Sequence, residues 1–138
     1  MKLKDLLPGC GAYGEVEVTG VTNDSRNVRE GYAFVCVTKG PSIDAHDYAL
    51  DAERAGASII VAKRDTGAKT QLLVEDPQKA YAVMCANYFG NPAKRLKLIG
   101  ITGTNGKTST SLFVKSILER LGCKVGLIGT IQNMVGEE

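Results

Sequence analysis

The sequence predicts an α/β fold in two parts. The first is an N-terminal α/β domain over residues 1–90, and the second is the incomplete start of a parallel-sheet domain over residues 91–138. Short apolar runs alternate with helical patterns along the first part. The polar, proline-bearing stretch Asn91-Pro92-Ala93-Lys94-Arg95 then marks a domain boundary. Beyond it an apolar run, a glycine-rich turn and an amphipathic helix follow one another directly.

The first part is expected to contain four strands and three helices. Capping residues predict where the two longer helices begin. Asp44 precedes a helix over residues 45–55, and Asp76, followed by Pro77, precedes a helix that ends at Gly90. The remaining elements are a short helix over residues 2–7 and strands over residues 15–21, 32–37, 58–62 and 71–74.

Composition indicates an ordinary folded protein. Hydrophobic residues make up 43% of the 138 residues, which supports a packed core, and a net charge of +2 gives no nucleic-acid or membrane signal. No apolar run approaches the roughly 18 residues that span a bilayer, and the N-terminus has no signal-peptide core. The 4 cysteines are widely spaced and there is one histidine, so we expect no zinc site and a reduced, cytoplasmic protein.

The stretch GITGTNGKTST, from Gly100 to Thr110, predicts a phosphate-binding loop. The apolar run over residues 96–101 is expected to be a buried parallel strand, and a helix with one apolar face follows the loop. Glycines let the backbone turn its N–H groups toward one point, and a helix N-terminus adds free N–H groups and a positive dipole end. Lys107 is then placed to reach the outer phosphates of a nucleotide, and the Thr108 hydroxyl to hold Mg²⁺.

The glycine spacing departs from the common pattern G-x-x-x-x-G-K-[ST], whose first glycine would fall at position 101. Ile101 stands there, and the glycines are instead Gly100, Gly103 and Gly106. The alternative interpretation is an ordinary strand-to-helix turn. That alternative leaves unexplained why Lys107 begins a helix, where the helix dipole disfavours a cation.

The last residues predict a single β-α-β unit. Gly122 ends the helix, and residues 124–128 are expected to form the next parallel strand. Two strands and one helix cannot bury both faces of a parallel sheet. We therefore expect the chain to be an N-terminal piece of a longer enzyme.

Three segments resemble the Mur ligase family. The first is GITGTNGKTST followed by Gly129-Thr130-Ile131-Gln132-Asn133. The second is TNDSRNVREGYAFVCV, where an Asp-Ser-Arg triplet precedes a strand, and the third is GPSIDAHDY. The resemblance runs through the whole chain in order. It is greatest to the branch that adds the third amino acid to UDP-N-acetylmuramoyl-L-alanyl-D-glutamate in peptidoglycan synthesis.

The resemblance implies an ATP-dependent amide ligase that uses Mg²⁺. ATP phosphorylates the substrate carboxylate, and an incoming amine attacks the acyl phosphate. The implied partners are small molecules, without nucleic acid or membrane, and a monomer is expected. The family's metal-binding carboxylate, its modified lysine and its amino-acid-binding domain lie beyond residue 138. The chain alone should therefore not catalyse ligation, and meso-diaminopimelate and L-lysine both stay open as the third amino acid.

The family's functional residues carry over to two sets of positions. The implied ATP-binding set is Gly103, Thr104, Asn105, Gly106, Lys107, Thr108 and Ser109, with Thr108 also holding the metal. Ser109 stands where the family usually has a second threonine, and it keeps the hydroxyl. The implied substrate-binding set is Asn23, Ser25, Ser42, Ile43 and Asp44.

Several alternatives stay open. The protein could be the alanyl-alanine-adding member of the family, a folylpolyglutamate synthetase, or a phosphate-loop kinase or switch with an appended binding module. The Asp-Ser-Arg segment favours a muramoyl ligase over a folylpolyglutamate synthetase. At the level of residues, Ser25 could be only a turn residue, Asp44 only an N-cap and His46 only structural.

Overall fold

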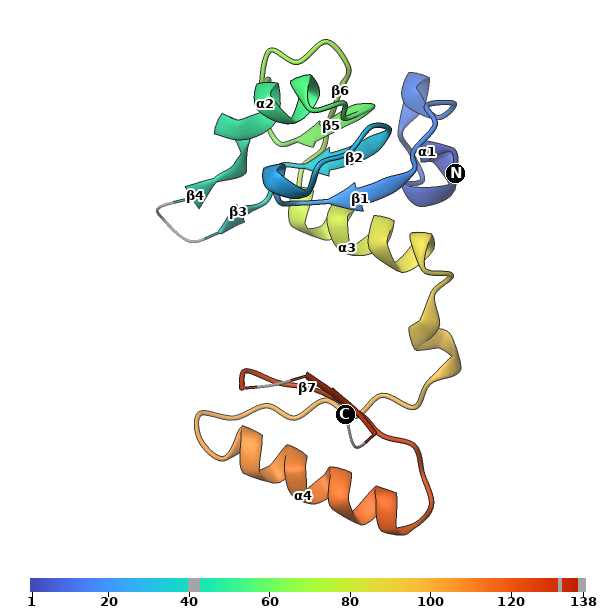
Figure 1. The fold of residues 1–138 in the computed structure, drawn as a ribbon, viewed down its shortest axis with the longest axis vertical. Helices are drawn as coiled ribbons and strands as arrows, with labels where there is room; N and C mark the ends of the chain where they lie inside the picture. Colours follow the sequence, from blue (N-terminus) through green and yellow to red (C-terminus); the bar gives the residue numbers. More distant parts are fainter. Residues whose placement is uncertain (40–42, 132, 137–138) are drawn as a thin grey trace. The chain divides into compact units, whose positions relative to one another are not determined.

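The computed structural model describes residues 1–39, 43–131 and 133–136. The chain divides into two compact units, Met1–Leu96 and Lys97–Glu138. The first unit carries a parallel sheet between helices, and the second carries one long helix and a hairpin (Figure 1). Each unit is described below by itself.

A four-stranded parallel sheet forms the centre of the first unit. The strand order is β1-β2-β5-β6, and the strands are β1 (Gly20–Thr22), β2 (Tyr32–Val35), β5 (Ile59–Ala62) and β6 (Gln71–Leu73). In the central pair, Phe34 of β2 lies beside Ile60 of β5. All four residues of β5 are buried, as expected for a parallel strand that is covered on both faces. The predicted fold class, α/β with a parallel sheet, is confirmed.

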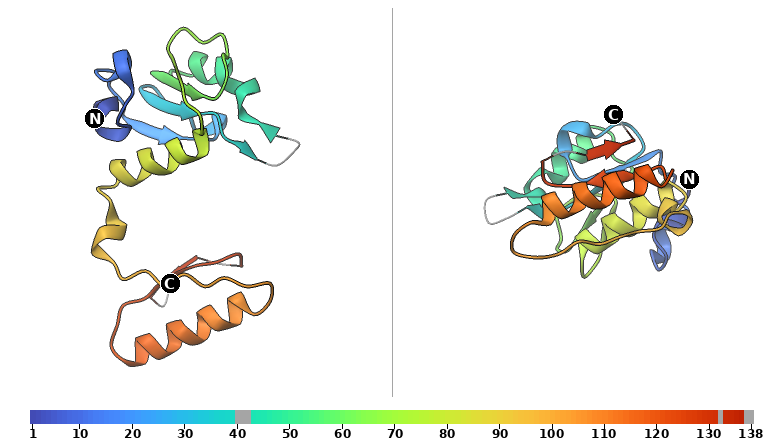
Figure 2. Two further views of the ribbon diagram at one scale, coloured as in Figure 1. Left: turned by 180° about the vertical axis from the view of Figure 1, so that it is seen from behind. Right: turned by 90° about the horizontal axis from the view of Figure 1, so that it is seen from below.

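Helices cover both faces of this sheet, as two opposite views show (Figures 1 and 2). On one face lie α1 (Leu3–Leu6) and α3 (Pro77–Tyr88), and the buried core there is Leu3, Leu6, Cys10, Val18, Ala33, Val35, Val37, Ile59, Val61, Ala80 and Met84. On the other face lies α2 (Ala49–Arg54), with Phe34, Cys36, Ala45, Ala49, Ala52, Ile60, Ala62 and Ala68. Alternate residues of the central strands serve opposite faces because side chains along a strand alternate.

Carboxylate caps begin the two longer helices of the first unit at the predicted places. An oxygen of Asp76 accepts a hydrogen bond from the backbone N–H of Lys79 at 3.0 Å, and Pro77 is the first residue of α3. Asp44 accepts in the same way from the backbone N–H of His46 at 3.0 Å. Its helix begins as the 3-10 turn η3 (Ala45–Tyr48) before it continues as α2. A capping side chain fixes a helix start because it satisfies a free N–H of the first turn.

The smaller elements are shorter than the sequence suggests. The strand predicted over 15–21 begins only at Gly20, because Glu17 makes just an isolated bridge to Lys2. The strands predicted over 32–37, 58–62 and 71–74 each lose one or two residues. The first unit also holds a short antiparallel pair, β3 (Thr38–Lys39) with β4 (Ile43–Asp44), and the 3-10 turns η1 (Gly11–Tyr13), η2 (Ser25–Asn27) and η4 (Pro92–Arg95).

The second unit corrects the predicted parallel β-α-β unit. It contains α4 (Lys107–Arg120) and an antiparallel hairpin of β7 (Gly126–Ile128) with β8 (Asn133–Val135). Residues 96–101 form no strand, and Leu98 and Ile99 are exposed. The predicted parallel strand over 124–128 is in fact one arm of the hairpin. A hairpin partner follows after a short turn, whereas a parallel pair needs a crossover and cover on both faces. The described residues of this unit do not supply that cover.

The helix α4 has the apolar face that the sequence predicted, and this face is exposed. Phe113, Ile117 and Leu121 expose 69%, 58% and 73% of their surface. The buried residue of this helix is Lys115, whose ammonium lies 2.6 Å from the carboxylate of Glu119. An amphipathic pattern names the face that can be buried, but the burial itself depends on which elements are present to pack there. None of the helices in the described part of the chain is both long and apolar enough to cross a membrane.

Candidate functional site

The predicted phosphate loop leads directly into α4. Gly106 is the N-cap of α4 with a φ of +74°, and Gly103 has a φ of +153°. Residues with a side chain rarely adopt either angle, so the loop needs glycine at these two positions. Gly106 has no side chain, and no side chain in the described part of the chain caps α4. Its first N–H groups are therefore available to an anion, and the helix dipole adds to that preference.

Lys107 and Thr108 are the first two residues of α4. The Lys107 ammonium donates a hydrogen bond of 2.6 Å to the carbonyl oxygen of Gly103, which places the cation over the loop. Thr108 is exposed, and so are Thr104, Asn105 and Ser109. The structure thus brings all the predicted nucleotide residues together in one loop and helix start. This group offers a cation, free N–H groups and hydroxyls, which suit a phosphate chain and its Mg²⁺.

The predicted substrate residues follow two neighbouring strands of the first unit. Asn23 and Ser25 come directly after β1, and Asp44 ends the β3–β4 pair that follows β2. Because the strands of the sheet are parallel, their carboxyl ends meet at one edge, which is where open α/β sheets bind ligands. Ile43 is placed by its backbone pairing with Lys39. Ser42, the fifth predicted residue, lies outside the described residues.

The Asp-Ser-Arg triplet forms a braced turn at this edge. The Asp24 carboxylate accepts from the Arg26 backbone N–H at 3.0 Å and pairs with the Arg26 guanidinium through bonds of 2.9 and 2.6 Å. The backbone N–H of Asp24 donates to the Thr22 hydroxyl at 3.1 Å. Ser25 is half-buried, and its hydroxyl makes no hydrogen bond to any residue that the structure describes. Its neighbours therefore fix its position while its hydroxyl stays available to a ligand.

Asp44 is the centre of a second polar group at the same edge. One oxygen accepts from the His46 backbone N–H at 3.0 Å and lies 2.5 Å from Nδ1 of the same residue. The other oxygen lies 2.9 Å from the guanidinium of Arg64. The backbone hydrogen bond from His46, followed by the one from its imidazole, holds the pKa of Asp44 below its ordinary value. Asp44 is therefore an ionised cap, whatever it also does for a ligand.

A hollow of about 130 Å³ opens beside this polar group. It is lined by Cys36, Val37, Thr38, His46, Lys63, Asp76, Pro77 and Gln78. Burial raises the pKa of the Cys36 thiol to about 12, with a further contribution from the charge of Asp44. The thiol is thus protonated and inert at neutral pH. A larger hollow of about 500 Å³ lies between the Leu7–Gly9 turn, β6 and α3, away from the predicted site residues.

The sequence did not single out Lys63 and Arg64, which contribute to this edge from the end of β5. Because β2 and β5 pair side by side, the Arg64 guanidinium reaches Asp44 and the Lys63 backbone N–H reaches His46. The available signal in the sequence was the segment His46-Asp47-Tyr48, which begins two residues after Asp44. In the part of the chain that the structure describes, no cluster of three or more His, Cys, Asp or Glu side chains is arranged to hold a metal ion.

Known proteins that are similar in sequence cover both units of the chain. Residues 101–138 match the model of the Mur ligase middle domain. The UDP-N-acetylmuramoyl-L-alanyl-D-glutamate–2,6-diaminopimelate ligase of Clostridium perfringens (strain 13 / Type A) is 44% identical over 146 residues, covering 100% of this chain and 30% of that protein. The chain thus spans less than a third of the length of this curated relative.

Solved structures give the same result. A structure of a UDP-N-acetylmuramoyl-L-alanyl-D-glutamate–2,6-diaminopimelate ligase matches 100% of this chain and 29% of its own, with a TM-score of 0.80 at 20% identity, which supports the fold. The MurF ligase of Thermotoga maritima in complex with ADP matches 76% of this chain and 24% of its own, with a TM-score of 0.54 at 32% identity. The resemblance first indicated by the loop and the Asp-Ser-Arg triplet is confirmed: over its whole length this chain is similar to Mur ligases, and its residues 101–138 match their middle domain.

Proposed function

We propose that this chain is the substrate-binding and phosphate-loop segment of an ATP-dependent ligase that acts on UDP-N-acetylmuramoyl-L-alanyl-D-glutamate. The observation that carries the proposal is the 44% identity, over the whole chain, to a ligase named for that substrate. The ligase would add the third amino acid of the peptidoglycan precursor peptide. The names of the relatives favour 2,6-diaminopimelate over L-lysine as that amino acid.

The second unit would hold ATP. Phosphoryl transfer to a carboxylate needs charge stabilisation around the transferred group more than it needs covalent chemistry from the protein. Lys107 would leave the Gly103 carbonyl and contact the outer phosphates, while the N–H groups at the start of α4 bind the phosphate oxygens. Thr108 would contribute its hydroxyl to Mg²⁺, which supplies the remaining positive charge when bound. The similar MurF ligase of Thermotoga maritima is in complex with ADP, which supports nucleotide binding by this chain.

The first unit would hold the UDP-muramoyl dipeptide. Asn23, Ser25, Ser42, Ile43 and Asp44 are the proposed contacts, over a substrate domain of residues 1–90. Two observations support this assignment: the Ser25 hydroxyl makes no hydrogen bond to a residue that the structure describes, and Ser25 lies at the carboxyl edge of the sheet. The proposal places the protein in the cytoplasm, because nucleotide-linked precursors and ATP are its substrates. It also includes the expected monomer.

Activity is measured in a protein of the relatives' full length that carries this segment. We expect amide formation with stoichiometric release of ADP and phosphate, dependent on the UDP-muramoyl dipeptide, ATP, Mg²⁺ and diaminopimelate together. Omitting any one of them should stop sustained ADP release; without diaminopimelate, at most one equivalent of ADP per enzyme can form together with the acyl phosphate. ADP release that needs no UDP-muramoyl dipeptide would point instead to a phosphate-loop kinase or switch and would contradict the proposal.

A further inference from the structure

His46, in the 3-10 turn η3, lies at the carboxyl edge of the sheet, where the segment after β2 meets the segment after β5. Its side chain is 7% exposed. On one side Nδ1 faces an oxygen of Asp44 at 2.5 Å, and on the other side Nε2 accepts the backbone N–H of Lys63 at 3.0 Å. One imidazole therefore joins the segment that follows β2 to the segment that follows β5. The two residues that it joins, His46 and Lys63, are 17 positions apart in the sequence.

The two partners determine which nitrogen of the ring carries the proton. The Lys63 N–H is a donor, so Nε2 must present its lone pair and carry no hydrogen. The Asp44 carboxylate is an acceptor, so Nδ1 must donate. Only the neutral ring with its hydrogen on Nδ1 satisfies both contacts. A proton added at Nε2 would turn this nitrogen into a donor. It would then face the Lys63 N–H, which is also a donor, and the hydrogen bond between them would break.

We propose that neutral His46 is a positioning residue of the substrate site, and that its protonation releases the loop after β5 and weakens binding of the UDP-muramoyl substrate. This inference rests on the proposed function. His46 acts through Asp44 and Lys63 and needs no contact with the substrate of its own. The bridge holds Arg64 against Asp44, at 2.9 Å, and near Asp47, at 3.6 Å.

The other ionisable groups around His46 were considered as the source of the proposed pH dependence. Asp44, on the same side as Nδ1, has a lowered pKa and remains a carboxylate. Cys36 from the end of β2 has a pKa of about 12 and remains a thiol. Arg64 and Asp47 pair at the rim, and Lys63 and Asp76 line the hollow that His46 also lines. Of these side-chain types, imidazole is the one whose ordinary pKa lies between mildly acidic and neutral pH.

The protonation state can be read directly, because the chain has one histidine and hence one set of imidazole signals. Long-range ¹H–¹⁵N correlation of the 138-residue chain should show one protonated and one bare ring nitrogen, with the hydrogen on Nδ1. As the pH falls, the Lys63 amide signal should shift with the same midpoint as the His46 ring. A hydrogen on Nε2, or a Lys63 amide that ignores the ring titration, would overturn the bridge.

Binding is then measured by titration with UDP-N-acetylmuramoyl-L-alanyl-D-glutamate across the same pH range. We expect affinity to fall about three- to tenfold, the size of one net hydrogen bond, as the pH drops through the His46 midpoint. Affinity that stays constant across that midpoint would refute the positioning role. Absence of binding at every pH would refute the proposed function and the positioning role with it, while the ring spectra would still decide the bridge.

Two substitutions test the contacts of His46 with Asp44 and with Lys63 separately. His46→Gln places an amide oxygen near the position of Nε2 and can still accept from Lys63, whereas His46→Asn reaches only the position of Nδ1. We expect His46→Gln to keep most of the affinity but lose its pH dependence, and His46→Asn to bind about three- to tenfold more weakly at every pH. Arg54→Gln, which removes an exposed cation from α2, is the control and should keep the wild-type pH profile. Equal behaviour of the Gln and Asn variants would contradict a role for the Lys63 contact.

Discussion

The ammonium of Lys107 lies 2.6 Å from the carbonyl oxygen of Gly103, four residues earlier in the chain. The lysine thus bends back over the loop that begins its own helix. This contact is exposed, and it satisfies one donor of a group that has three. It also keeps the cation at the loop that leads into the first N–H groups of α4, the kind of place where phosphates bind.

Lys107→Ala should therefore remove catalysis and spare substrate binding. In a protein of the relatives' full length, we expect at least about a hundredfold loss of turnover at saturating ATP, because one charge is lost from the site of phosphoryl transfer. Affinity for the UDP-muramoyl dipeptide, measured by calorimetry, should stay within about twofold. Lys124→Ala removes the same charge from an exposed position of the second unit and serves as the control. Near-normal turnover of Lys107→Ala would mean that another cation serves the phosphates.

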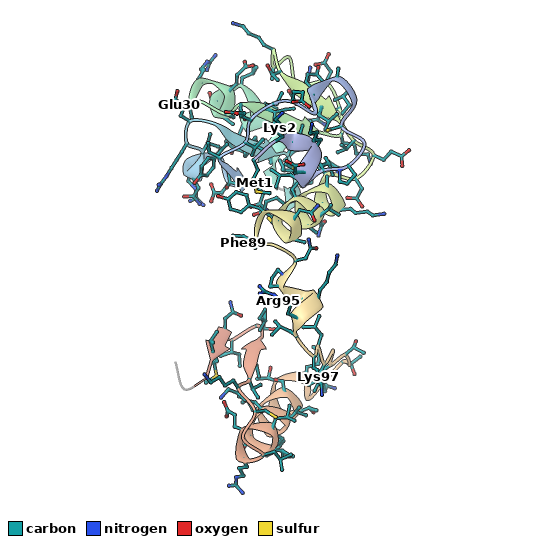
Figure 3. The ribbon with its side chains drawn as sticks, turned by 90° about the vertical axis from the view of Figure 1, so that its right-hand side faces the viewer. Met1, Lys2, Glu30, Phe89, Arg95 and Lys97 are labelled. Atoms are coloured by element: carbon teal, nitrogen blue, oxygen red, sulfur yellow. The ribbon has the colours of Figure 1, made fainter. Side chains whose placement is uncertain are left out.

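Trypsin should cut first between the two units. Lys94 and Arg95 lie on the 3-10 turn η4, Lys97 begins the second unit, and all three are exposed (Figure 3 labels Arg95 and Lys97). Short exposed segments between compact units are the preferred sites of cleavage. Mass spectrometry of a brief digest should show a stable fragment that ends at residues 94–97. An early cut inside residues 1–90, before any cut at this segment, would contradict the proposed domain boundary.

Asp76→Ala should destabilise the first unit by about 1 kcal/mol, because the helix cap at Lys79 is lost. The midpoint of urea unfolding, followed by circular dichroism, measures this change. Asp51→Ala is the matched control, since Asp51 makes only an exposed ion pair with Arg54. Surface pairs of this kind contribute about 0–1 kcal/mol, so the control should lose less. Equal losses in both variants would mean that the cap at Asp76 contributes nothing specific.

The sequence predicted those features of the fold that local chemistry determines. Asp76 and Asp44 cap their helices, and Gly106 turns into α4, because short polar side chains and glycine set backbone geometry over a few residues. The predicted phosphate loop and the Asp-Ser-Arg turn are also local features. Each is a contiguous segment whose residues act on one another directly.

The missed features depend on partners that are distant in the sequence. His46 accepts from Lys63 only because β2 and β5 pair side by side, and no local pattern encodes that contact. Residues 96–101 have the composition of a buried strand, but a strand forms only where a neighbour offers hydrogen bonds. The apolar face of α4 is exposed for a similar reason, since the hairpin of its own unit does not cover Phe113 or Ile117. The hydrophobic pattern of a segment therefore predicts which of its residues can be buried. Whether they are buried depends on the elements that pack against the segment.

The most direct measurement of the central claim is calorimetric titration of the 138-residue chain with UDP-N-acetylmuramoyl-L-alanyl-D-glutamate. Wild type should bind, and Ser25→Ala should bind about 10- to 100-fold more weakly, because a hydroxyl hydrogen-bonded to a charged group is worth roughly 1.5–3 kcal/mol. Ser116→Ala, an exposed serine on α4 of the second unit, should bind as wild type does. Equal affinity of Ser25→Ala and wild type would reduce Ser25 to a turn residue, and no binding by wild type would contradict the assignment of this chain as the muramoyl-binding segment of the ligase.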